Sequence, residues 1–72
     1  MTSALMNMAE LDIEKVLKDM GLEIYLPEIV EQGFDDLDYL MSLDNENLIV
    51  FFSAVGISKL GHQQRIKAKL YP

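Results

Sequence analysis

The chain has 72 residues, of which half are hydrophobic and a quarter are charged. This length and composition are typical of one small globular domain, and the hydrophobic fraction is too high for a disordered chain. The absence of cysteine excludes a disulfide framework and a thiolate metal site. No stretch approaches the roughly 18 consecutive apolar residues that a membrane span needs.

Charge is distributed unevenly along the chain. Residues 1–50 contain all twelve acidic residues and two lysines, a balance of −10, whereas residues 51–72 contain four basic residues and no acid, a balance of +4. The overall charge of −6 disfavours general nucleic-acid binding, because most of the surface would repel phosphates. Two regions of opposite sign can, however, attract copies of the same chain head to tail.

The first predicted helix lies between residues 7 and 20. Asn7 and Glu10 have the spacing of a capping box. The apolar residues that follow at approximately helical spacing are Leu11, Val16, Leu17 and Met20, and Gly21 suits the position after the last helical residue.

A second helix is predicted over residues 23–32, which contain Pro27. Because proline has no N–H, the regular hydrogen-bonded part should begin close to it, and Gly33 should end the helix. Its apolar residues form two i,i+4 rows, Tyr25 with Ile29 and Leu22 with Leu26 and Val30.

Asp35 and Asp44 are the predicted N-caps of a third and a fourth helix. The third contains Leu37, Leu40 and Met41, and the fourth runs through Leu48, Phe51, Phe52 and Val55 to Gly56. The stretch LIVFFSAV, residues 48–55, is rich in strand-forming residues, but no other segment alternates with period two to pair with it, so a helix is favoured.

Ser58 is the predicted N-cap of the fifth helix, which is the longest with a clear amphipathic pattern. Leu60, Ile66 and Leu70 should face inward, beneath a polar and basic outer side.

This arrangement of helices resembles the sterile alpha motif (SAM) domain family. The resemblance covers about residues 11–70 and depends on two stretches, VLKDMGLEIYLPEIVEQGFDDLDYLMSL and VGISKLGHQQRIKAKL. The second is similar to the family's hydrophobic-Gly-Ile, Gly-His and basic-Ile signature before and in the last helix. The resemblance implies an all-α, five-helix bundle with a long C-terminal helix, as one domain over residues 1–72 with its core at about 9–70.

Two features depart from the family pattern. Seven residues separate Leu48 from Gly56, which is about four more than usual in the family and close to one helical turn. We therefore expect a fourth helix that is longer by one turn, with its apolar face nearly in phase. The first helix also lacks the tryptophan that many members have.

His62, the single histidine, lacks the partners that catalysis needs. Residues 51–72 contain no cysteine, no acid and no second histidine. We expect His62 to hydrogen-bond neighbouring backbone and to pack on the core, as the resemblance also implies; the alternative is that it tunes an interface with pH. We expect no enzymatic activity, and no cofactor, metal ion or small-molecule substrate.

A basic set, Lys59, Arg65, Lys67 and Lys69, surrounds Gly61 in the last helix. By our count Gly61 is at position N3 of this helix, where glycine lowers stability by up to about 1 kcal/mol relative to alanine. Either a frayed first turn tolerates it, or the missing side chain lets an acidic group of another chain approach the helix N-terminus. The resemblance implies that this helix start is an end-helix surface, for which the candidates are Lys59, Gly61, Arg65 and Lys69.

Five acidic residues surround the third helix, where the resemblance implies the mid-loop surface that an end-helix surface binds. Since Asp35 and Asp44 are explained as N-caps, the interface candidates are Asp36, Asp38 and Glu46. No Asp-x-Asp-x-Asp-Gly calcium loop is present, and so small a domain has little room for the cleft of a glycosidase with two carboxylates.

Phe51 allows two interpretations. It lies about 100° from Phe52 on a helix, so we expect that only one of the two is fully buried. Phe51 is then either a core residue or an exposed aromatic anchor in an interface.

The sequence as a whole predicts a protein-interaction module that binds itself or another SAM-like domain. The alternative is RNA stem-loop binding by the basic patch, although four charges predict modest, salt-dependent affinity and the helix has no aromatic residue for base stacking. Nucleic acid and membrane are not the expected partners. The absence of cysteine, and of a basic n-region at the start, favours the cytoplasm or nucleus.

Overall fold

The computed structural model describes residues 11–71 of the chain. Within this range it has five α-helices and one 3-10 turn, and no strand. They are α2 (Asp12–Met20), the 3-10 turn η1 (Glu23–Tyr25), α3 (Leu26–Glu31), α4 (Leu37–Met41), α5 (Asn45–Ala54) and α6 (Leu60–Leu70). The predicted all-α class, with a long C-terminal helix and a helix over LIVFFSAV, is confirmed.

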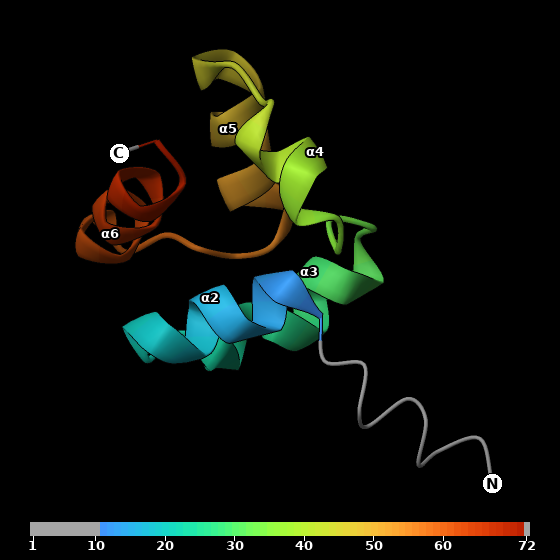
Figure 1. The fold of residues 1–72 in the computed structure, drawn as a ribbon. Coiled ribbons are helices and arrows are strands. Elements are labelled where there is room, and N and C mark those ends of the chain that lie inside the picture. Colours follow the sequence, from blue (N-terminus) through green and yellow to red (C-terminus); the bar gives the residue numbers. More distant parts are fainter. Residues whose placement is uncertain (1–10, 72) are drawn as a thin grey trace, which may run out of the picture.

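The helices surround one apolar core. Figure 1 shows α2 and α3 on one side of the molecule, and α4, α5 and α6 on the other. Every helix contributes buried side chains to this core, and no polar or charged residue of the described range is buried. The buried residues are Ile13, Leu17, Leu22, Ile29, Leu40, Leu48, Phe51, Phe52, Val55, Ile57, Ile66 and Leu70. None of the described helices combines the length and apolarity needed to cross a bilayer.

The start of the first described helix differs from the prediction. The capping box at Asn7 and Glu10 lies outside the described residues, and Leu11 precedes α2 in extended backbone without a side-chain cap. Because the helix begins at Asp12, its inward row is Ile13 and Leu17, one turn apart, while Leu11 is exposed. The apolar spacing counted from Leu11 was therefore wrong for this end of the helix.

The ends of α2 and α5 have the same geometry. Gly21 and Gly56 have φ values of 70° and 76°, in the left-handed region that glycine adopts without strain. After each, the next residue donates its N–H to a carbonyl five residues earlier, Leu22 to Leu17 at 2.8 Å and Ile57 to Phe52 at 2.9 Å. These are the bonds of a Schellman motif, which places the residue after the glycine against the core.

Pro27 lies in the first turn of α3, close to the predicted start. The residues before it form η1 instead of a regular α-helix, because proline has no N–H with which to continue a regular helix from the preceding turn. In the second predicted row Leu22 is buried and Leu26 is half-buried, but Val30 is exposed, so only part of this row faces inward.

The start of α6 is shifted by one residue from the prediction. Its N-cap is Lys59, which makes no side-chain capping bond, instead of Ser58. Gly61 is therefore at N2 and not N3. Ile66 and Leu70, one turn apart, are buried as predicted, whereas Leu60 is 65% exposed, because N1 lies at the end of the helix, away from the buried row.

Candidate functional site

The basic surface, Lys59, Gly61, Arg65 and Lys69, lies on α6 and is exposed throughout. Gly61, Arg65 and Lys69 are spaced four residues apart, so they follow one side of the helix. A Cβ atom built on Gly61 would meet no heavy atom within 4 Å. Packing within the described part of the chain therefore does not require glycine at this position.

Arg65 has a partner within the domain. Its Nη2 donates to the carbonyl oxygen of Met20, the last residue of α2. A cationic donor at the C-terminal end of a helix is favourable, because the last carbonyls are unpaired and carry the negative end of the helix dipole. Arg65 thus links α6 to α2, a structural role that the sequence did not predict.

His62 joins the start of α6 to η1. The Tyr25 hydroxyl and His62 Nδ1 lie 2.5 Å apart, and the two rings meet edge to face with centroids 5.5 Å apart. The prediction of a backbone partner was wrong, because the side chain reaches a residue 37 positions earlier. His62 is half-buried, and in the described range no carboxylate or nucleophile bonds to it. Nor does that range contain a cluster of side chains that could hold a metal ion.

The acidic surface, Asp36, Asp38 and Glu46, lies at the starts of α4 and α5 and is exposed. The N-cap of α4 is Asp36 and not Asp35, since Asp36 Oδ1 accepts from the N–H of Asp38 at 3.0 Å and of Tyr39 at 3.4 Å. Asp36 therefore also has the capping role that was predicted for its neighbour Asp35. Asp44 caps α5 as predicted, through Asn47 N at 2.9 Å.

The exposed aromatic residue beside these acids is Tyr39, which the sequence analysis did not single out. Its side chain is 51% exposed, and its ring stacks on Phe34 with centroids 6.3 Å apart. Phe34 in turn meets Phe51 edge to face at 4.9 Å. Helical spacing could have found it, because position 39 lies about 200° from Leu37 and away from Leu40.

Phe51 is not an exposed anchor. It is 1% exposed and Phe52 is 4% exposed, so both are buried. Two neighbouring positions can both be covered because α5 packs into the core, with Phe34 against one ring and Gln63 of α6 near the other. The outer side of α5 instead exposes Ile49 and Val50.

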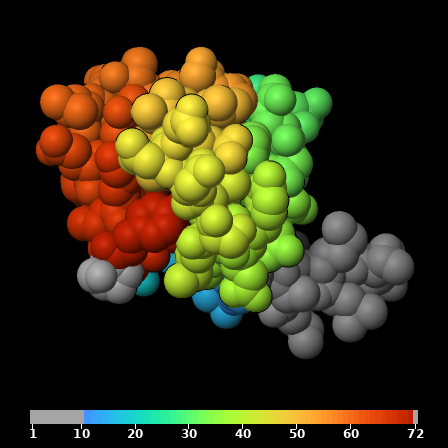
Figure 2. Space-filling view, turned by 90° about the horizontal axis from the view of Figure 1, so that it is seen from above, coloured from blue at the N-terminus to red at the C-terminus, as the bar shows by residue number. Residues whose placement is uncertain are grey.

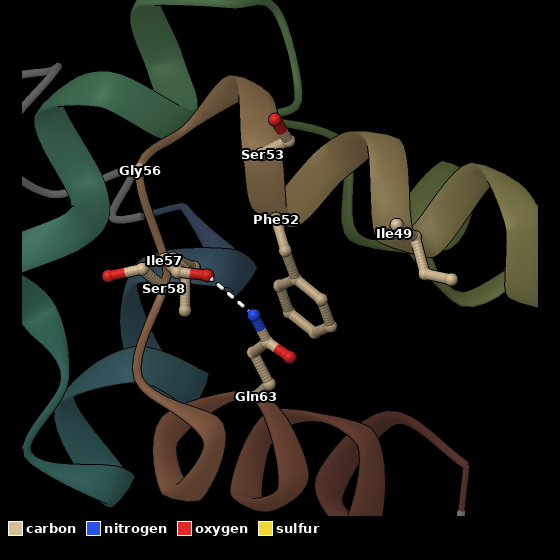
Figure 3. A pocket seen from close by; sticks show the side chains of 7 residues that line it. All are labelled: Ile49, Phe52, Ser53, Gly56, Ile57, Ser58 and Gln63. Carbon is tan, nitrogen blue, oxygen red and sulfur yellow. Dashed lines mark hydrogen bonds between the residues drawn. The ribbon is translucent and has the colours of Figure 1, made fainter.

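A groove of about 390 Å³ lies between α5 and α6. Figure 3 shows Phe52 and Ile49 projecting from α5, and Gln63 projecting from α6 below them. The residues that line the groove are Ile49, Phe52, Ser53, Gly56, Ile57, Ser58 and Gln63. Ser58 precedes Lys59 in the chain, and the backbone N–H of Gln63 donates to the carbonyl oxygen of Lys59. The groove is therefore next to the basic surface.

The start of the basic surface lies apart from the acidic surface. In Figure 2 the yellow-green residues of α4 lie apart from the orange residues that lead into α6, with α5 between them, whereas the red C-terminal end of α6 lies beside α4. Within residues 11–71, no ion pair joins the two surfaces. Both are therefore available to other molecules at the same time.

Comparison with known proteins gives one family and one curated relative. The model of the SAM domain (sterile alpha motif) family matches residues 7–70. A phosphatidylinositol 3,4,5-trisphosphate 5-phosphatase 2B of Danio rerio is 33% identical over 58 residues, which are 81% of this chain and 4% of that protein. The chain thus spans only a small part of this relative. No solved structure is matched.

Proposed function

Because this chain belongs to the SAM domain family of protein-interaction modules, we propose that it associates head to tail with another SAM domain. The acidic surface of one molecule binds the basic surface of the next. Such a heterologous contact leaves one surface free at each end, so it builds open helical polymers, or rings if the rotation closes.

The observation that carries this proposal is the separation of opposite charges on one small domain. The carboxylates of Asp38 and Glu46 make no hydrogen bond or ion pair with any described residue, and neither do the ammonium groups of Lys59 and Lys69. These solvated charges lose little internal stabilisation when a partner binds. Oppositely charged patches also steer association and fix its orientation.

The test is the mass of the domain in solution, by sedimentation velocity at about 0.05 M salt. We expect association of the wild type, and its loss in Lys69→Glu and in Asp38→Lys. Matched controls are Lys67→Glu, on the same helix but about 200° away, and Glu31→Lys on α3; both should associate like the wild type. Arg65→Glu is a poor choice because it also breaks the bond to Met20.

Mixing the two charge variants separates homotypic from heterotypic association. A 1:1 complex of Lys69→Glu with Asp38→Lys is expected if the chain pairs with itself, because each variant keeps one intact surface. If the wild type stays monomeric at high concentration, self-association is wrong, and a foreign SAM domain becomes the partner to test.

RNA stem-loop binding remains the alternative for the basic surface, and retention of a stem-loop pool at about 0.1 M salt would support it. We propose no catalytic role, because the matched part of the phosphatase is only 4% of that protein. We propose that the domain works in the cytoplasm or nucleus, because a chain without cysteine suits a reducing compartment.

A further inference from the structure

The groove between α5 and α6 has the size and chemistry to receive an aromatic side chain. Its volume of about 390 Å³ is at the small end of the range of ~300–1,000 Å³ for ligand pockets. Ile49, Phe52 and Ile57 provide an apolar lining, and the serines at 53 and 58 add hydroxyl groups.

One polar atom in the groove is held in place as a hydrogen-bond acceptor. Gln63 Nε2 donates to the carbonyl oxygen of Ile57 at 2.8 Å, which fixes the amide group. Figure 3 shows its oxygen pointing away from Ile57, beside the Phe52 ring. No donor within the described residues bonds to this oxygen, so the groove offers a site for an incoming O–H group.

Tyr39, beside the acidic surface, has a ring and a hydroxyl group that match the apolar lining and the free acceptor of the groove. It is exposed, its hydroxyl bonds to no described residue, and its ring is supported by Phe34, which is itself packed on buried Phe51. Because stacking already restricts the ring, burying it in a partner costs little additional conformational entropy.

The charges beside Tyr39 and the groove are complementary. Tyr39 follows Asp38 and donates its backbone N–H to Asp36, while Ser58 of the groove precedes Lys59, at the positive N-terminal end of α6. A molecule that inserts Tyr39 into the groove therefore brings carboxylates toward cationic and N–H groups.

We infer that Tyr39 of one copy of this chain docks in the α5–α6 groove of a second copy, with its hydroxyl donating to Gln63 Oε1. This inference rests on the proposed head-to-tail association and names its central contact. Tyr39 and the groove lie on different elements, so each molecule can insert and receive at once, and the contact repeats along the assembly.

The test compares variants at the two halves of the contact, by sedimentation of the full chain at low salt. Tyr39→Ala removes the ring and Ser53→Trp fills the groove; each should weaken association by at least about tenfold, as for a central aromatic anchor. Ala54→Trp is the matched control, because residue 54 is the exposed neighbour of Ser53 and does not line the groove. It should associate within about twofold of the wild type. Tyr39→Phe, which loses only the bond to Gln63, should fall between wild type and Tyr39→Ala.

A mixture of Tyr39→Ala and Ser53→Trp should give a 1:1 dimer that grows no further, since the first keeps its groove and the second keeps its tyrosine. If the wild type associates but either variant does so equally well, the docking of Tyr39 is wrong and the proposed function stands. If the wild type does not associate with itself, both the proposed self-association and this contact are wrong. Circular dichroism and thermal unfolding of each variant show whether it is folded.

Discussion

At the scale of single residues, several side chains have a role other than the one their position in the sequence indicated. His62 lacked a partner in its own segment, and its partner is Tyr25, 37 residues earlier. Arg65 binds the carbonyl of Met20, and the Tyr71 hydroxyl lies 3.0 Å from the carbonyl oxygens of Leu40 and Leu43. These bonds join α6 and its C-cap residue to segments 28 to 45 residues earlier in the chain.

The three tyrosines provide a test of these long-range bonds. Tyr25→Phe and Tyr71→Phe should each lower the free energy of unfolding by about 1 kcal/mol, because each removes a hydroxyl group that is hydrogen-bonded in the fold and leaves its partner unpaired. For a domain of this size that is a fall of about 4–8 °C in Tm. Tyr39→Phe should leave Tm unchanged, since its hydroxyl has no partner among the described residues. Thermal unfolding by circular dichroism measures all three, and equal Tm values would contradict the structural role of the bonds.

Replacing Gly61 tests whether glycine at this position favours binding while lowering the stability of the domain. No atom lies where its Cβ would be, so Gly61→Ala should stabilise the domain by up to about 1 kcal/mol through helix propensity. The same change should weaken association, because a methyl group then lies on the basic surface. Urea unfolding and sedimentation measure the two effects; a variant that is more stable and associates normally would show that glycine is merely tolerated here.

At the scale of elements, the helices of this domain are short and depend on their ends. α4 has five residues and α3 has six, well below the length at which a helix is stable in isolation. Both pack against the core, and each has one local device: Gly33, in left-handed backbone, follows α3, and Asp36 caps α4. Asp36 combines a structural role with a proposed binding role, since it caps α4 and also belongs to the acidic surface.

The caps of α5 and α6 should differ in their response to mutation. Asp44→Ala removes the acceptor of the Asn47 N–H and should cost about 1 kcal/mol. Ser58→Ala should change stability by less than about 0.5 kcal/mol, because Ser58 caps nothing in the structure. Chemical unfolding of both variants is the measurement. A larger loss for Ser58→Ala than for Asp44→Ala would favour the cap predicted from sequence over the cap observed.

At the scale of the whole molecule, the uneven charge has different consequences for folding and for association. The core contains no buried charge among the described residues, so folding depends on apolar burial, whereas the proposed contact joins exposed charges. Raising the salt from about 0.05 to 0.5 M shortens the Debye length from more than 10 Å to less than 8 Å.

Salt should therefore dissociate the assembly without unfolding the domain. We expect the dissociation constant to rise by at least about tenfold over this range, while Tm shifts by only a few degrees. Sedimentation and calorimetry on the same samples measure the two quantities. Association that is insensitive to salt would contradict a contact steered by charge.

The sequence by itself determined the all-α class, the number of helices in the described range, and most of their ends. These features follow from local chemistry: Pro27 sets a helix start, Asp44 supplies a cap, and Gly21 and Gly56 adopt the left-handed backbone that ends a helix. The sequence also determined that acidic and basic residues occupy different segments, and its signature residues indicated the family that the comparison established.

Only the tertiary structure decided which side chains meet across the chain and which remain exposed. Periodicity alone could not show that both Phe51 and Phe52 are buried, because that depends on Phe34 and α6 packing around α5. Nor could it show that Tyr39 stacks on Phe34, or that a groove opens between α5 and α6. Each of these contacts joins residues from separate elements, so its existence depends on how the helices are arranged in space, and local sequence chemistry does not specify that arrangement.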